Sequence, residues 1–192
     1  MRVLWEEHKK EEDWGFLLID ARNAFNEENR TAILWAVWHE WPGVAQFTFN
    51  CYCHWATLVF KDIGDGSGHF LHSKEGVTQG DPLDMIAHGI GVLPLIRELW
   101  DANPCVTQPQ YADDAGAGGA IQQAQAHFWD MQARGPARRY YLEPTKSILV
   151  VTPGNAARAE EHFRGLGIRV VTGHRYLGGF IGDAAAEQEW QK

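Results

Sequence analysis

The stretch WGFLLID, residues 14–20, is a short apolar run that ends on an aspartate. An apolar run of this length, without the spacing of an amphipathic helix, is typical of a strand buried on both faces. We therefore expect a buried strand that is closed by Asp20.

A second acidic group lies in YADD, residues 111–114, between two segments with strand composition. This arrangement predicts a tight hairpin. Side chains alternate along a strand, so Asp113 should point at the site and Asp114 only partly. If the hairpin neighbours the strand that ends at Asp20, three carboxylates meet and repel one another. Mg²⁺ relieves such repulsion, and two ions about 4 Å apart can clamp the oxygens of a phosphoryl transfer. An ordinary turn and an ordinary strand end are the alternative.

The rest of the chain alternates between helical and extended patterns. Helical composition is found in residues 26–40, 81–102, 120–134 and 156–166. Strands are expected in residues 46–60, 69–73, 106–111, 115–118, 147–152, 168–171 and 176–181. Residues 62–68 have turn composition, so residues 69–73 can return as the hairpin partner of the strand before them. This order predicts an α+β fold, an antiparallel sheet with the YADD hairpin and with helices on one face.

Composition limits the class of protein. Hydrophobic residues make up 45% of the 192 residues, so a packed core is expected, and three cysteines argue against a disulfide framework. No apolar run reaches the roughly 20 residues of a membrane helix, and the charged N-terminus lacks a signal-peptide core. We expect an intracellular protein without a membrane, with cytoplasm and nucleus both open.

Five segments, in order, resemble motifs of the reverse-transcriptase family. FLLIDARNAF (16–25) resembles motif A, GVTQGDPL (76–83) motif B, YADD (111–114) motif C, LEPTKSIL (142–149) motif D and RYLGG (175–179) the primer-grip motif E. The wording is more similar to retrotransposon or intron-type enzymes than to retroviral ones. The resemblance implies a polymerase palm, a nucleotidyltransferase that makes DNA on an RNA template.

The resemblance implies a metal site and a charge donor. Asp20 and Asp113 would bind two Mg²⁺ ions, or Mn²⁺, with Asp114 beside them and the carbonyl of Ala21 completing a shell. Lys146 would act near the leaving pyrophosphate as charge stabiliser or general acid. A solvated lysine at a strand edge is the alternative for that residue.

The resemblance also implies residues that bind the nucleotide. The amides of Asn23 and Ala24 would lie near the triphosphate, and Phe25 would exclude a 2′-hydroxyl as a steric gate. Gln79 and Gly80 would line the nucleotide and template pocket. The alternative for Phe25 is a core residue where a strand meets a helix.

The last motif implies a hairpin that supports the primer end, formed by Tyr176, Leu177, Gly178 and Gly179. The implied partners are an RNA template, a DNA primer and dNTPs.

The chain departs from the family in its extent and its charge. We divide it into a charged N-terminal segment (1–13), a palm-like domain (14–182) and a C-terminal tail (183–192). Fingers and thumb regions are therefore expected to be missing or supplied by another chain. The net charge of −8 counts against nucleic-acid binding, unless the basic contacts lie in those other regions.

Two further hypotheses stay open. The chain could be a catalytically inactive palm-fold interaction module, which the charge and the missing flanks favour. It could instead be an RNA-directed RNA polymerase, against which Phe25 argues because a gate of that size should reject ribonucleotides.

Overall fold

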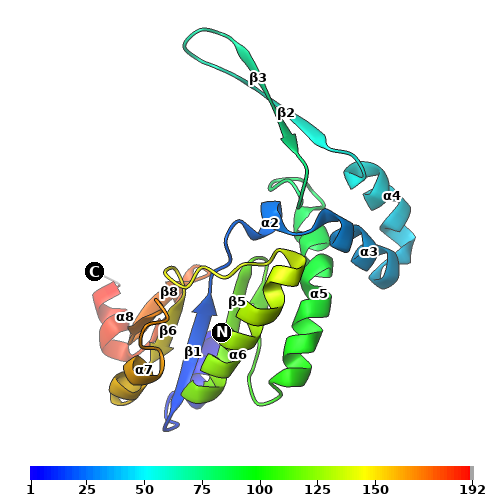
Figure 1. Cartoon of the computed structure of the whole chain (residues 1–192). Helices are drawn as coiled ribbons and strands as arrows, with labels where there is room; N and C mark the ends of the chain where they lie inside the picture. Colours follow the sequence, from blue (N-terminus) through cyan, green and yellow to red (C-terminus); the bar gives the residue numbers. More distant parts are fainter. Residues whose placement is uncertain (191–192) are drawn as a thin grey trace. The chain divides into compact units, whose positions relative to one another are not determined.

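The computed structural model describes residues 1–190, and its contacts divide the chain into two compact units. Unit 1 contains Met1–Ala21, Glu98–Arg134 and the chain from Tyr141 onward. Unit 2 contains Arg22–Arg97 and Gly135–Tyr140. Each unit is described by itself (Figure 1).

Unit 1 is built on a five-stranded sheet with the strand order β4-β5-β1-β6-β7. Every pairing is antiparallel except that of β6 with β7. The central strand β1 is buried along its whole length, which explains why it is an unbroken apolar run. The strands are β1 (Trp14–Ile19), β4 (Gln110–Tyr111), β5 (Asp114–Ala120), β6 (Ile148–Val151) and β7 (Arg169–Val171).

Elements pack on both faces of this sheet. Phe16 and Leu18 of β1 form a cluster with Ile148 and Val150 of β6, which are their cross-strand neighbours, and with Trp5 of α1 (Arg2–His8). The hairpin of β8 (Gly173–Tyr176) and β9 (Gly179–Gly182) packs here as well. Helices α6 (Ile121–Arg134) and α7 (Ala156–His162) pack on the other face of the sheet, which is the front face in Figure 1.

The expectation of helices on one face is therefore wrong. Trp5 is only 1% exposed, and burying so large an apolar ring holds α1 against the face away from α6. The segment 1–13 thus takes part in the packing of unit 1. Within the tail 183–192, Ala184–Trp190 form helix α8, which contacts β8 and β9, and residues 191 and 192 lie outside the described residues.

Strand β5 is rich in glycine because the aromatic side chains of β1 lie across it. Gly118 pairs with Phe16, and a Cβ there would lie 3.1 Å from both Phe16 Cδ2 and Leu4 Cδ2. A larger residue would push the ring and α1 away from the sheet.

Unit 2 consists of helices and a long hairpin. Its elements are α2 (Ala24–Glu27), α3 (Arg30–Glu40), α4 (Pro42–Tyr52), β2 (Ala56–Lys61), β3 (Gly68–Ser73) and most of α5 (Asp84–Ala102), which continues into unit 1. Among residues 1–190, the two remaining elements are short 3-10 helices, Gly135–Arg138 in unit 2 and Pro153–Asn155 in unit 1. The predicted hairpin around residues 62–68 is confirmed by the pairing of β2 with β3.

The predicted strand over residues 46–60 is wrong in its first half. Residues 46–52 belong to α4, which begins with Pro42 in its first turn, where the fixed φ of proline suits a helix. Helix α4 packs against α3, and this contact outweighs the strand preference of its aromatic and β-branched residues.

A buried arginine joins the base of the hairpin to the segment that follows it. Arg30 is 6% exposed, and its guanidinium donates hydrogen bonds to the backbone carbonyls of Ser73, Glu75 and Gly76. Val77 N donates to Phe25 O at 2.7 Å, so the motif B-like segment is bound directly to the end of the motif A-like segment.

Helix α5 begins at Asp84 and not at residue 81. Asp81 lies in the preceding turn, where its Oδ1 accepts from Leu83 N and its backbone carbonyl accepts from Asp84 N. Over the described residues, no helix combines the length and the apolar character that crossing a membrane requires.

Candidate functional site

The candidate site of unit 1 lies where β1 and β5 end side by side. Ile19 pairs with Ala115, so Asp20 and Asp114 follow at the same end of two neighbouring strands. Tyr111 pairs with Asp114, and Ala112 and Asp113 form the turn between β4 and β5. Ala112 adopts a left-handed conformation (φ 53°), as two-residue hairpin turns require.

The three carboxylates influence one another electrostatically. The pKa of Asp20 is raised mainly by burial. The charge of Lys146 opposes this shift, and the charges of Asp113 and Glu143 add to it. The pKa of Asp114 is raised by burial first and then by Asp113 and Asp20. The negative charges of the two strand ends therefore share one neighbourhood, in which Lys146 is a compensating cation.

A cavity of about 270 Å³ opens at these strand ends. Its lining includes Asp20, Asp114 and Lys146. Tyr176 and Leu177, which were predicted for the primer-grip hairpin, also line the cavity. The structure thus brings together five predicted residues from four of the five motif-like segments. Asp114 lines this cavity and Asp113 does not, whereas strand alternation alone had favoured Asp113.

The segment that resembles motif D wraps around Asp20. The backbone N–H of Asp20 donates to Ser147 Oγ at 3.1 Å, and the backbone carbonyl of Asp20 accepts from Glu143 N at 2.8 Å. Ala21 forms an isolated antiparallel bridge with Leu142. These bonds fix the end of β1 relative to Lys146, although Lys146 itself is exposed.

Carboxylate oxygens are the donors that Mg²⁺ prefers, and mutually repelling carboxylates gain most from a cation. The donor chemistry of Asp20, Asp113 and Asp114 therefore fits the ion. Within the part of the chain that the structure describes, however, no three His, Cys, Asp or Glu side chains are gathered closely enough to hold a metal. The metal site stays a prediction, and binding would require these side chains to draw closer together.

The segment that resembles motif E forms a hairpin. Tyr176 pairs with Gly179, and Leu177 (φ 48°) and Gly178 (φ 77°) form its turn. The Tyr176 hydroxyl is buried without a hydrogen-bond partner, and burial raises the pKa of Tyr176, with Asp114 and Asp113 adding to the shift. Contact with a primer stays a prediction.

The residues predicted to bind the nucleotide belong to unit 2. Asn23 is exposed and left-handed (φ 44°), and its side chain donates to Glu27. Ala24 and Phe25 are buried. Gln79 and Gly80 are exposed, and Gly80 N donates to Asp84 Oδ2 at 2.6 Å.

Phe25 lies in a setting that sequence reasoning did not foresee. Its ring stacks on His88 with 4.4 Å between centroids, and His88 Nδ1 lies 2.8 Å from Glu28 Oε2. Glu28 and His88 are both fully buried, and burial raises the pKa of Glu28. This setting suits a core phenylalanine, the alternative considered above, as well as a rigidly held gate.

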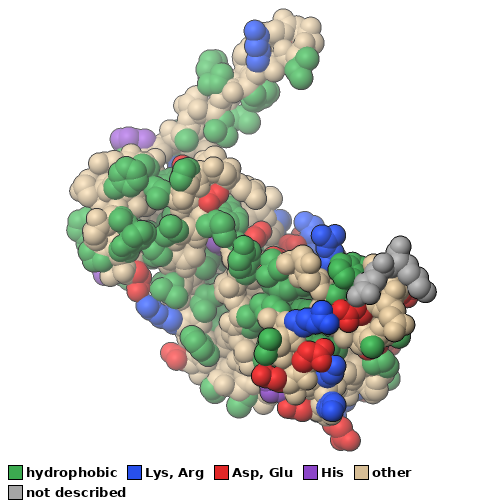
Figure 2. All heavy atoms as spheres, turned by 180° about the vertical axis from the view of Figure 1, so that it is seen from behind, with side chains coloured by type: hydrophobic (Ala, Val, Ile, Leu, Met, Phe, Trp, Pro, Cys, Tyr) green, Lys and Arg blue, Asp and Glu red, His purple; other side chains and the backbone are tan. Residues whose placement is uncertain are grey.

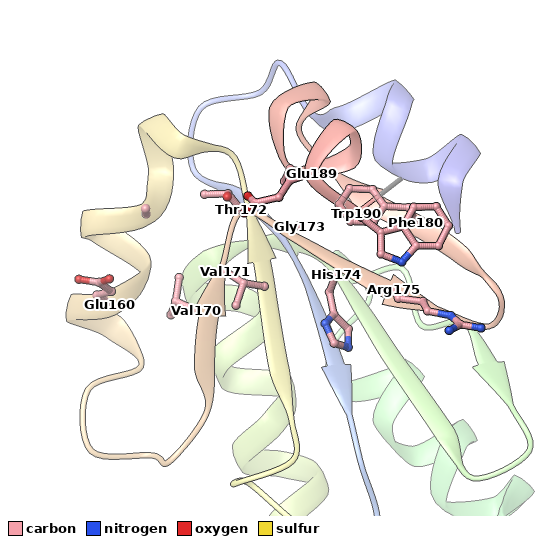
Figure 3. Close-up of a pocket in the computed structure, with 12 residues that line it drawn as sticks. Glu160, Val170, Val171, Thr172, Gly173, His174, Arg175, Phe180, Glu189 and Trp190 are labelled. Atoms are coloured by element: carbon pink, nitrogen blue, oxygen red, sulfur yellow. The ribbon is translucent and has the colours of Figure 1, made fainter. Parts of the chain in front are cut away.

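Sequence reasoning also missed two residues of β8. His174 and Arg175 line the carboxylate cavity and a second, larger cavity (Figure 3). Arg175 is the first residue of RYLGG, so its place in that motif was the available signal.

Comparisons with known proteins show a similarity of fold to solved structures. No protein-family model matches the chain, and no curated protein matches it. Among solved structures, it is similar to apo telomerase from Candida tropicalis, with a TM-score of 0.59 and 12% identity over 79% of this chain and 30% of that chain. For a form of that telomerase truncated from the C-terminal domain, the TM-score is 0.58 and the identity is 15%, over 77% of this chain and 32% of that chain.

For telomerase from Candida albicans in complex with a TWJ fragment of telomeric RNA, the TM-score is 0.58 and the identity is 11%, over 79% of this chain and 30% of that chain. The chain spans about a third of the length of these telomerases or less. At such identities the likeness shows the fold alone. The chain therefore has a distant reverse-transcriptase-like fold.

Proposed function

We propose that this chain is the catalytic palm of an RNA-directed DNA polymerase, which adds dNTPs to a primer 3′ end. The observation that carries the proposal is that Asp20 and Asp114 follow the paired ends of β1 and β5 and line one cavity, with Asp113 in the adjoining turn. Its support is that this happens in a fold similar to that of telomerase.

The carboxylates and the lysine have distinct proposed roles. Asp20, Asp113 and Asp114, with the carbonyl of Ala21, would hold two Mg²⁺ ions, which would supply charge neutralisation at the reacting phosphate. Lys146, which lines the same cavity as Asp20, would offset charge on the departing pyrophosphate. Positioning of primer and nucleotide would then contribute most of the remaining rate.

The other roles rest on the sequence resemblance. Asn23 and Ala24 would contact the triphosphate, Phe25 would select the sugar, and Gln79 and Gly80 would line the nucleotide pocket. Residues 176–179 would support the primer. The parent enzyme would be of the retrotransposon or intron type. Because the chain spans about a third or less of the telomerase chains, fingers and thumb regions would come from further segments or another chain.

The experiment is primer extension on an RNA template with Mg²⁺, comparing dNTPs with NTPs. We expect dNTP incorporation that Asp113→Ala abolishes and that Asp101→Ala, which removes an exposed carboxylate from α5, leaves unchanged. Phe25→Ala should admit ribonucleotides. Extension that survives Asp113→Ala would contradict the proposal, and incorporation of NTPs by the unaltered chain would point to an RNA-directed RNA polymerase.

A palm-fold interaction module without catalysis is the second candidate. The net charge of −8 favours it, as does the lack of a gathered metal-ligand group within residues 1–190. Titration calorimetry with Mg²⁺ separates the two candidates. The polymerase requires binding that Asp113→Ala weakens, whereas the module requires none.

A further inference from the structure

The larger cavity of unit 1 lies beside the carboxylate cavity and outside the proposed chemistry. It has a volume of about 690 Å³ and is lined by residues of α7, β7, β8, β9 and α8 (Figure 3). Pockets of roughly 300–1,000 Å³ hold small organic groups. The two cavities share the lining residues His174 and Arg175, so they adjoin at β8.

One wall of this cavity is a pair of stacked aromatic rings. Phe180 and Trp190 have ring centroids 5.5 Å apart and an angle of 26° between their planes, and Figure 3 shows them side by side. Phe180 is buried, whereas Trp190 is 45% exposed. The indole is thus supported on one side while much of its surface stays open, which suits a flat ring that stacks on it.

The charged groups of the cavity have both signs. Arg175, Glu160 and Glu189 line it, and their side chains make no hydrogen bond or ion pair with any other residue among 1–190. A free phosphate would gain from Arg175 but would be repelled by two carboxylates. A nucleobase carries acceptors that suit arginine and amino groups that suit glutamate, so it matches both signs.

We propose that this cavity binds an unstacked nucleobase of a single-stranded nucleic acid. Its ring would lie on Trp190, and its polar edge would face Arg175 and the carboxylate of Glu189 or Glu160. The proposal deepens the proposed function and rests on it for the class of ligand. A strand held at Asp20 and Asp114 would continue past His174 and Arg175 and place one of its bases here.

The test is fluorescence anisotropy with end-labelled single-stranded oligonucleotides of each base at low salt. Trp190→Ala should weaken binding about tenfold, as expected for the loss of one stacked base, and Trp190→Phe should retain most of the affinity. Trp129→Ala is the matched control because it removes a similarly exposed tryptophan (48%) from α6. It should bind as the unaltered chain does. Circular dichroism confirms that each variant is folded.

An abasic oligonucleotide of the same length should compete poorly. Equal competition by the abasic strand, unchanged affinity in Trp190→Ala, an equal loss in Trp129→Ala, or no binding by the unaltered chain would each overturn the inference. Asp113→Ala should abolish extension but preserve this binding. Binding that depends on Trp190 without any extension would sink the proposed function alone, whereas extension with binding indifferent to Trp190 would sink this inference alone.

Discussion

At the scale of single residues, the acidic ends of β1 and β5 carry an electrostatic cost. Asp114 is half-buried, and burial, Asp113 and Asp20 together hold its pKa above the usual range of a carboxyl group. A raised pKa in the folded state means that the folded chain binds more protons than the unfolded chain just above pH 4. The contribution of Asp114 to stability is therefore present at low pH and is lost as the pH rises through the folded pKa.

Asp114→Asn should remove this loss. We expect the variant to be slightly more stable than the unaltered chain at pH 7, by less than about 1 kcal/mol, because solvent screens a partly exposed group. The gain should shrink towards pH 4. Urea unfolding at both pH values measures it, with Asp101→Asn on α5 as an exposed control. If the free energies of unfolding of Asp114→Asn and of the unaltered chain changed in parallel with pH, Asp114 would not have a raised pKa in the folded state.

At the scale of elements, the hairpin of unit 2 contributes little burial. Strands β2 and β3 form a two-stranded sheet, and all residues of β2 are exposed. Figure 2 shows its side chains standing free along the projecting arm. A two-stranded hairpin is marginally stable by itself, and here Arg30 holds its base.

Replacing the cross-strand pair Val59 and Phe70 by threonine should therefore change the free energy of unfolding by no more than about 0.5 kcal/mol for each substitution. Ile33→Ala on α3 is the contrast, since Ile33 is fully buried in the same unit and its truncation should cost about 2–5 kcal/mol. Thermal and urea unfolding give both values. A loss in Phe70→Thr as large as that in Ile33→Ala would mean that the hairpin is packed in solution.

At the scale of the whole molecule, net charge limits nucleic-acid binding. The chain carries a charge of −8, so few cations are available to displace counterions from a strand. If Lys146, which lines the carboxylate cavity, is the one phosphate contact, the slope of log affinity against log salt should be about −0.7 for a single strand.

Anisotropy between 50 and 200 mM salt measures that slope, and Lys146→Ala should reduce its magnitude by about 0.7. Lys61→Ala, on the projecting hairpin, should leave it unchanged. A slope of −4 or steeper would contradict the expectation and reveal a broader basic contact.

The sequence by itself determined the features that depend on neighbouring residues. Alternation, apolar runs and turn residues act within a few positions, so they predicted the buried strand before Asp20, the hairpin at residues 62–68 and the helix that became α6. Only the tertiary structure decided which faces and side chains meet. It turned residues 46–52 into helix, placed α1 on the second face through Trp5, and paired Glu28 with His88. These outcomes depend on packing between segments far apart in the chain, for which no local pattern carries a signal.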